Sequence, residues 1–127
     1  MSKKLIYICS PLRGDYESNI ENAETYCRLV MKFIPNAIPI APHIYFTRFL
    51  HDTDEEERRL GMAAGIELLD KCDELWAFDM DAPSEGMRAE IEYAKERGIP
   101  VKDGNIAISD HIIKNLQGGI KCNKTET

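Results

Sequence analysis

Four short apolar segments alternate with longer segments of helical periodicity, and this alternation restricts the fold of the chain more than any other feature. The apolar segments are residues 4–9, 37–41, 73–78 and 99–102. Residues 4–9 (KLIYIC) are almost continuously apolar or aromatic, which is typical of a parallel strand buried on both faces. The predicted helices are residues 16–33, 53–71, 85–97 and 107–116. Alternating strands and helices of this kind predict an α/β fold.

The order of these elements predicts the topology of the sheet. Right-handed crossovers make the strand order 2-1-3-4 the simplest arrangement, with residues 4–9 as the first, central strand. We therefore expect a single-domain, doubly wound, Rossmann-like (flavodoxin-like) parallel sheet of four to five strands. Pro39 favours an edge position for strand 37–41, because proline has no N–H to donate. Residues 1–118 are expected to form the domain and residues 119–127 a C-terminal tail.

Length and composition exclude several classes of protein. The chain has 127 residues, of which 43% are hydrophobic and 30% charged, and this indicates one ordinary globular domain. No stretch approaches the roughly 18 apolar residues of a membrane span, and the N-terminus lacks the apolar region of a signal peptide. We therefore expect a cytoplasmic protein with no membrane partner. The four cysteines form no C-x-x-C pair and only three histidines accompany them, so no disulfide framework, metal or cofactor is expected.

The net charge limits the partners of the chain. A formal charge of -6 argues against binding to a nucleic-acid polymer, which requires a basic surface. A small anionic ligand is still compatible, because one or two arginines and a helix N-terminus set the local field that a phosphate meets. Residues 45–50 (YFTRFL) are expected to be partly exposed, which favours a homo-oligomer, either a dimer or larger.

The chemistry is expected at one edge of this sheet. Ligands of doubly wound sheets bind beyond the carboxyl ends of the strands, where the strand order reverses. The loops at that edge are residues 10–15, 42–50 and 79–86. Residues 42–52 are expected to be irregular, and to form a loop over a pocket or a flap packed on the core, two alternatives that are compatible with each other.

Glu90 is the candidate that helical phase singles out. Met87, Ile91 and Ala94 define the buried stripe of helix 85–97, and Glu90 falls within this stripe near the helix N-terminus. A carboxylate in such a position must be paired, hydrogen-bonded or functional. The other charged residues of this helix fall on the opposite, solvated face: Glu85, Arg88, Glu92, Lys95 and Glu96.

Several residues near these loops are suited to an anionic ligand. Ser84 and Gly86 begin helix 85–97, where free N–H groups favour an anion and glycine allows its close approach; a simple N-cap serine is the alternative. Arg13, in the loop after the first strand, offers a second anion contact. His43 is a candidate for contact with phosphate or base, with loop packing as the alternative. The full set of candidate substrate- and phosphate-binding residues is Ser10, Arg13, Gly14, His43, Ser84, Gly86 and Met87.

Over roughly residues 4–101 the chain resembles the nucleoside 2-deoxyribosyltransferase and 2'-deoxynucleoside 5'-phosphate N-hydrolase superfamily. The resemblance is carried by I-Y-I-C-S-P-L-R-G at residues 6–14, D-E-L-W-A-F at residues 73–78, and S-x-G-x-x-x-E at residues 84–90 followed by Tyr93-Ala94. Uncharacterised bacterial and phage members with an S-E-G-M-x-x-E-I motif are the most similar. The resemblance implies the doubly wound fold, a homo-oligomer and Glu90 as the nucleophile.

The resemblance also bears on the substrate. Ser84 matches the serine that helps to hold phosphate in the nucleotide N-hydrolases, where many nucleoside transferases have aspartate. Two positions depart from the hydrolases: Pro11 stands where their first loop has a serine, and helix 54–71 shows no obvious counterpart of their catalytic aspartate. The motifs therefore resemble the hydrolases more than the transferases, with these two exceptions.

We expect this chain to cleave the N-glycosidic bond of a (deoxy)nucleoside 5'-monophosphate through a covalent glycosyl-Glu90 intermediate, with release of the nucleobase. Tyr7 is expected to hydrogen-bond and orient Glu90, although a buried strand tyrosine is also ordinary core. Asp79 or Asp81 is the candidate acid for the departing base. Base exchange by a nucleoside 2-deoxyribosyltransferase is one alternative. A noncatalytic nucleotide-binding module, or a protein-interaction module with a vestigial pocket, is another.

Overall fold

A parallel sheet forms the centre of the chain, which this computed structural model describes over residues 3–12 and 14–126, with side chains as far as residue 117. The strands are β1 (Lys4–Cys9), β2 (Ala37–Ile40), β3 (Glu74–Ala77) and β4 (Val101–Asp103). Within the described ranges they form one four-stranded sheet in the order β2-β1-β3-β4, and each neighbouring pair is parallel. The predicted fold class, strand order and edge position of Pro39 are thereby confirmed.

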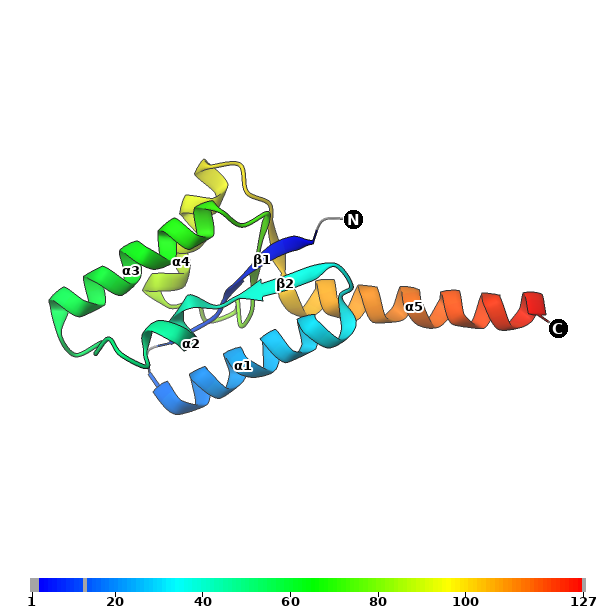
Figure 1. The fold of residues 1–127 in the computed structure, drawn as a ribbon, viewed down its shortest axis with the longest axis horizontal. Coiled ribbons are helices and arrows are strands. Elements are labelled where there is room, and N and C mark those ends of the chain that lie inside the picture. The colour runs from blue at the N-terminus through cyan, green and yellow to red at the C-terminus, as the bar shows by residue number, and fades with distance from the viewer. Residues whose placement is uncertain (1–2, 13, 127) are drawn as a thin grey trace.

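Helices cover both faces of this sheet (Figure 1). They are α1 (Tyr16–Phe33), α2 (Pro42–Phe46), α3 (Glu55–Asp70), α4 (Glu85–Glu96) and α5 (Gly104–Glu126). α3 and α4 pack on one face, whereas α1 and the first part of α5 pack on the other. Across the part of the chain that the structure describes, none of the helices is long and apolar enough to cross a membrane.

Three segments differ from the sequence-based prediction. Residues 42–46 are not irregular but form α2, whose first turn accommodates Pro42 because the N–H of that position has no helical acceptor. β4 begins at Val101 rather than at residue 99, since the Ile99 N–H donates to the Ala94 carbonyl and continues the turn that ends α4. α5 is longer than the predicted helix 107–116, and its backbone continues to Glu126 through the segment predicted to be a tail.

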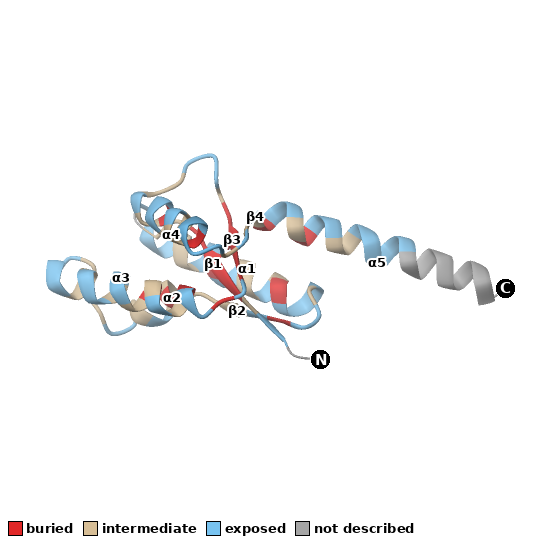
Figure 2. Cartoon of the chain, turned by 90° about the horizontal axis from the view of Figure 1, so that it is seen from above, coloured by how far each residue is buried: buried red, intermediate tan, exposed pale blue. Residues whose placement is uncertain are grey.

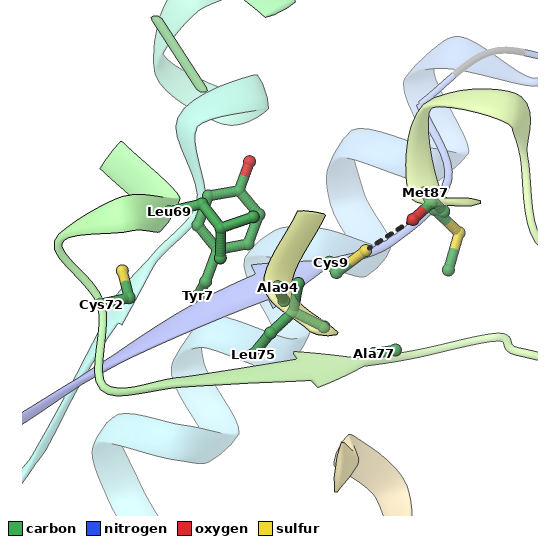
Figure 3. Close-up of a cluster of buried hydrophobic side chains, with 8 residues drawn as sticks. All are labelled: Tyr7, Cys9, Leu69, Cys72, Leu75, Ala77, Met87 and Ala94. Carbon is green, nitrogen blue, oxygen red and sulfur yellow. Dashed lines mark hydrogen bonds between the residues drawn. The ribbon is translucent and has the colours of Figure 1, made fainter. Parts of the chain in front are cut away.

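Side chains alternate between the two faces of the central strands. Tyr7, Cys9, Leu75 and Ala77 point toward α3 and α4 (Figure 3). Ile6, Ile8, Trp76 and Phe78 point toward α1 and α5. Figure 2 shows that the buried residues concentrate along β1 and β3. Because both faces of these strands are covered, nearly every residue in them is apolar, which is the pattern that predicted a buried parallel strand.

The aromatic segment after β2 is partly exposed, as the sequence predicts. Tyr45 and Phe49 are 64% and 52% exposed and contact each other edge to face at 5.1 Å between ring centroids. An exposed aromatic pair of this kind is compatible with a contact between copies of the chain. The homo-oligomer expected from the sequence stays a prediction.

Gly104, the first residue of α5, lies directly against the ring of the fully buried Phe78. A Cβ atom at position 104 would overlap this ring, so we expect Gly104→Ala to lower the free energy of unfolding by about 2–3 kcal/mol through overpacking. Chemical denaturation measures this loss. Gly86→Ala is the matched control, because a Cβ at that position meets no atom within 4 Å. A loss for Gly104→Ala no larger than that of the control would contradict the expectation.

Candidate active site

A cavity opens at the carboxyl end of β1, between α2, α3 and the N-terminus of α4. Seven of the candidate residues from the sequence line it: Tyr7, Ser10, His43, Ser84, Gly86, Met87 and Glu90. The edge of the sheet predicted from strand order is therefore the edge where these side chains meet.

Glu90 lies at the floor of this cavity, in the second turn of α4. Its neighbours on the same helical face, Met87 and Ala94, are fully buried, as the helical phase predicts. The Tyr7 hydroxyl donates a hydrogen bond to Glu90 Oε2, and the Cys9 thiol lies 3.4 Å from Glu90 Oε1. Both donors come from β1, where Tyr7 and Cys9 share the face that points toward α4 (Figure 3). The expected hydrogen bond of Tyr7 to Glu90 is present, while the contact of Cys9 was not predicted.

Burial governs the protonation of these three groups. It raises the pKa of Glu90 above its usual value, and the hydrogen bonds from Tyr7 and Cys9 offset part of that rise. Burial and the neighbouring Glu90 carboxylate also raise the pKa of Tyr7 and that of Cys9. Tyr7 and Cys9 are therefore neutral at pH 7 and act as hydrogen-bond donors. The result is a desolvated carboxylate held by two uncharged donors.

Gly65 allows α3 to approach the Glu90 carboxylate closely. A Cβ atom at position 65 would lie 3.4 Å from the Tyr7 hydroxyl oxygen and 3.9 Å from Glu90 Oε2. The absence of a side chain there leaves space directly beside the carboxylate. Gly65 therefore packs against the Tyr7 and Glu90 side chains that line the cavity.

The N-terminus of α4 forms a polar wall of the cavity. Ser84 is the N-cap, and its Oγ accepts a hydrogen bond from the Met87 N–H at 3.3 Å. As an acceptor in this bond, the serine hydroxyl still carries a proton that it can donate. The N–H groups of the first helical turn, including that of Gly86, have no acceptor within the helix. This wall therefore presents N–H and O–H donors at the positive end of a helix dipole.

His43, in α2, contributes a neutral side chain. Its Nε2 lies 3.1 Å from Ser10 Oγ, and burial lowers the pKa of His43 to about 4. The imidazole is therefore uncharged at pH 7. Ser10 itself is 7% exposed, so the pair closes one side of the cavity by hydrogen bonding and adds no positive charge.

The remaining candidates do not line the cavity as the structure describes it. Asp79 follows β3 in a left-handed conformation (φ 59°) and accepts a hydrogen bond from the Tyr26 hydroxyl at 2.8 Å. Tyr26 packs with the core on the α1 side, so the Asp79 carboxylate is held away from Glu90. Asp81 is exposed, and neither it nor Gly14 is a lining residue. Arg13 lies outside the described residues.

Sequence reasoning missed one charged end of the cavity. Asp52, Glu57 and Arg58 line it from the start of α3 and the loop before that helix. No local pattern distinguishes Glu57 and Arg58 from their neighbours Glu55, Glu56 and Arg59. The only indication in the sequence was the alternative in which residues 42–52 form a loop over a pocket. The residues that directly follow such a loop are expected to lie near the same pocket.

Across residues 3–12 and 14–117, no three His, Cys, Asp or Glu side chains gather in an arrangement that would hold a metal ion. The described cavity presents a partly buried carboxylate, hydroxyl and amide donors, and charged side chains at the start of α3.

The fold places the chain among Rossmann-like α/β proteins, with a cavity at the carboxyl edge of the sheet. It belongs to the family described as "Domain of unknown function (DUF7768)", whose family model matches residues 4–104. Among curated proteins, none matches it.

A solved structure with a similar fold is that of a 2-deoxyribosyltransferase from the psychrotolerant bacterium Bacillus psychrosaccharolyticus. The TM-score is 0.56 and the sequence identity 17%, and the match covers 76% of this chain and 69% of that chain. At this identity the likeness is one of fold.

Proposed function

We propose that this protein releases the nucleobase from a nucleoside 5'-monophosphate by hydrolysis of the N-glycosidic bond, with Glu90 as the nucleophile. The observation that carries the proposal is the partly buried Glu90 carboxylate, which lines the cavity and is desolvated there. It accepts from the neutral donors Tyr7 and Cys9, and no Lys or Arg of the described residues forms an ion pair with it. In a carboxylate that served packing alone, the two hydrogen bonds would offset the cost of desolvation only in part, whereas a nucleophile gains reactivity from that desolvation.

The reaction follows the retaining route in two displacements. A Glu90 oxygen forms a bond to the anomeric carbon C1' as the C1'–N bond breaks, and the base leaves with the bonding electrons and takes up a proton from an acid. A water oxygen then attacks C1', the ester bond to Glu90 breaks, and the water proton passes to the conjugate base of that acid. The products are the free base and ribose or deoxyribose 5-phosphate, and Glu90 is again a carboxylate.

The wall at the start of α4 is suited to the 5'-phosphate of this substrate. The Ser84 hydroxyl and the free N–H groups around Gly86 are donors at a helix N-terminus, where phosphate binds readily. Ser10, which lines the same cavity, adds a further hydroxyl. Arg13 stays a sequence-based candidate for the same phosphate.

Transfer of the sugar to a second base is the other candidate reaction. The observation that favours it is the similarity of fold to a 2-deoxyribosyltransferase. The first displacement on Glu90 is shared by both reactions, so only the acceptor differs: water gives a hydrolase, and a second nucleobase gives a transferase. In either case we propose that the protein is an enzyme whose partner is a small nucleotide or nucleoside.

The test is chromatography of purified protein incubated with a panel of nucleoside 5'-monophosphates and the matching nucleosides, in ribose and deoxyribose forms. We expect free base from one or more monophosphates without any added acceptor base. Exchange that requires a second base would support the transferase instead. Release of no base under either condition would contradict both reactions and favour a binding module.

Ser84→Asp tests the phosphate end of the cavity separately. Aspartate caps a helix as well as serine does, so α4 is expected to keep its N-terminus, while a negative charge replaces a hydroxyl donor. Losing this donor and adding repulsion should lower kcat/KM for monophosphates by roughly 10- to 150-fold relative to nucleosides. An equal effect on both substrates would contradict the assignment of the phosphate to this wall.

A further inference from the structure

Cys9 contacts Glu90 without lining the cavity. Its side chain is fully buried, and it is not among the described residues that form the cavity walls, whereas Tyr7 and Glu90 are. The Cys9 Sγ lies 3.4 Å from Glu90 Oε1 and 3.9 Å from the Met87 carbonyl oxygen, the second contact being drawn in Figure 3. A thiol has one proton to donate, and the carboxylate is both the nearer and the charged acceptor. Any effect of Cys9 on a bound substrate therefore passes through Glu90.

Two donors on one face of β1 hold the two oxygens of the Glu90 carboxylate separately. Side chains two positions apart on a strand share a face, so Tyr7 and Cys9 both point toward α4. The Tyr7 hydroxyl donates to Oε2 and the Cys9 thiol to Oε1. The last torsion of a glutamate side chain has a broad distribution, so a single donor leaves the plane of the carboxylate free to turn. A second donor on the other oxygen fixes that plane.

The elements packed on α4 determine what else acts on the Glu90 carboxylate. α3 meets it at Gly65, which has no side chain, and Asp70 of the same helix is bonded to the C-terminal end of α4. β3 and β4 contribute apolar side chains to this core: Leu75, Ala77 and Val101. The other titratable side chains that line the cavity come from α2, from the start of α3 and from the loop between them: His43, His51, Asp52, Glu57 and Arg58. Burial raises the pKa of Glu90 and the hydrogen bonds from Tyr7 and Cys9 lower it, so Cys9 is one of two neighbours that favour the ionised form.

We propose that Cys9 is a positioning residue, whose thiol fixes the plane of the Glu90 carboxylate so that the nucleophile keeps one orientation toward the sugar carbon. The inference rests on the proposed function, because that proposal places the sugar at Glu90. A thiol is a weak donor, so it orients the carboxylate while withdrawing little of the electron density that attacks C1'. Cys9 itself touches no substrate atom and forms no bond in the reaction.

The first measurement follows the protonation of Glu90 in the absence of substrate. Cys9→Ala removes the donor, whereas Cys9→Ser has nearly the same volume as alanine and keeps a hydroxyl, so the two variants differ in the donor rather than in packing. The midpoint is read from the pH dependence of the carboxyl carbon NMR signal of Glu90, assigned by its loss in Glu90→Gln. We expect a higher midpoint in Cys9→Ala than in the wild-type protein, and a lower midpoint in Cys9→Ser than in Cys9→Ala.

The second measurement is steady-state release of base. Loss of one hydrogen bond to the nucleophile should lower kcat about tenfold in Cys9→Ala, with KM within about twofold of wild type and a smaller loss in Cys9→Ser. Cys72→Ala and Cys72→Ser are the matched controls, because Cys72 is buried in the same core but its thiol donates to the Leu68 carbonyl at 3.3 Å. Both should keep the wild-type midpoint and kcat. Cys9→Val, which fills the space of the thiol without a donor, repeats the test if alanine unfolds the chain.

Two results would overturn the inference. Equal midpoints and equal losses of kcat in Cys9→Ala and Cys9→Ser would make Cys9 a packing residue, and a loss that falls on KM would make it a substrate contact. The proposed function fails separately. If the wild-type protein releases no base but the midpoints follow the expected order, the hydrolase proposal is wrong and the action of Cys9 on Glu90 stands. If base is released and the midpoint is the same in all three proteins, the reverse holds.

Discussion

Replacing Glu90 with glutamine is expected to lower the rate of base release by about 10⁴-fold, which corresponds to about 5.5 kcal/mol of activation free energy. The amide keeps the shape of the carboxylate, and the Tyr7 hydroxyl can still donate to its oxygen. An amide oxygen is, however, too poor a nucleophile to form the glycosyl ester. The loss should therefore fall on kcat, with nucleotide binding retained.

The measurement is steady-state release of free base together with calorimetric binding of the same nucleotide. Glu92→Gln is the matched control, because Glu92 lies on the exposed face of the same helix and should keep wild-type activity. Activity of Glu90→Gln within tenfold of wild type would remove Glu90 as the nucleophile.

The same substitution has an expected effect on stability. Because the pKa of Glu90 is raised in the folded state, ionisation of this carboxyl favours the unfolded chain, and stability falls as the pH rises from the unfolded pKa through the folded one. At a pH above both pKa values the wild-type protein carries this cost in full. Glutamine carries no charge, so Glu90→Gln should melt at a higher temperature than wild type, which separates loss of chemistry from loss of fold.

The second large effect is expected for Tyr7→Phe. The Tyr7 hydroxyl donates to the Glu90 carboxylate and so favours its ionised, nucleophilic form. Without this donor the pKa of Glu90 should rise further, and the acid limb of the kcat/KM profile should move to higher pH. Loss of one hydrogen bond to a charged group predicts about a 10- to 100-fold decrease in kcat/KM on that limb. At a pH well above the limb the decrease should be smaller.

A complete pH profile distinguishes this role from simple packing of the ring. Tyr93→Phe is the control, because the Tyr93 hydroxyl donates to Asp70 on the outside of the protein, at 3.1 Å. If Tyr7→Phe lowered activity equally at every pH, the hydroxyl would not tune the protonation of Glu90. An unchanged profile would remove Tyr7 from the site altogether.

Local periodicity explains which parts of the fold and site were predictable from the sequence. The continuous apolar run at residues 4–9 indicated a strand buried on both faces, and the order of strands and helices then left few topologies open. In the same way Glu90 was identified because its neighbours at helical spacing, Met87 and Ala94, are apolar. A residue's face on a helix or strand depends on residues a few positions away, so a sequence pattern determines it.

The charged groups around the cavity depended on contacts between distant segments. Asp79 seemed placed for catalysis at the end of β3, but its left-handed backbone and the Tyr26 hydroxyl, 53 residues away in sequence, hold the carboxylate elsewhere. Cys9 reaches Glu90 across 81 residues. The sequence periodicity of a single helix or strand does not predict such a contact, because the contact depends on how two elements pack against each other.

The sequence by itself determined the fold class, the strand order, the edge of the sheet at which the cavity opens and the inward direction of Glu90. Only the tertiary structure decided what surrounds that carboxylate: two neutral donors from β1, the bare backbone at Gly65, and the Arg58–Asp52 pair at the far end of the cavity. The physical reason is the range of the interactions. Secondary structure and burial follow from neighbours along the chain, whereas the protonation and selectivity of a site follow from side chains that only the packing of α3 and α4 against β1 brings together.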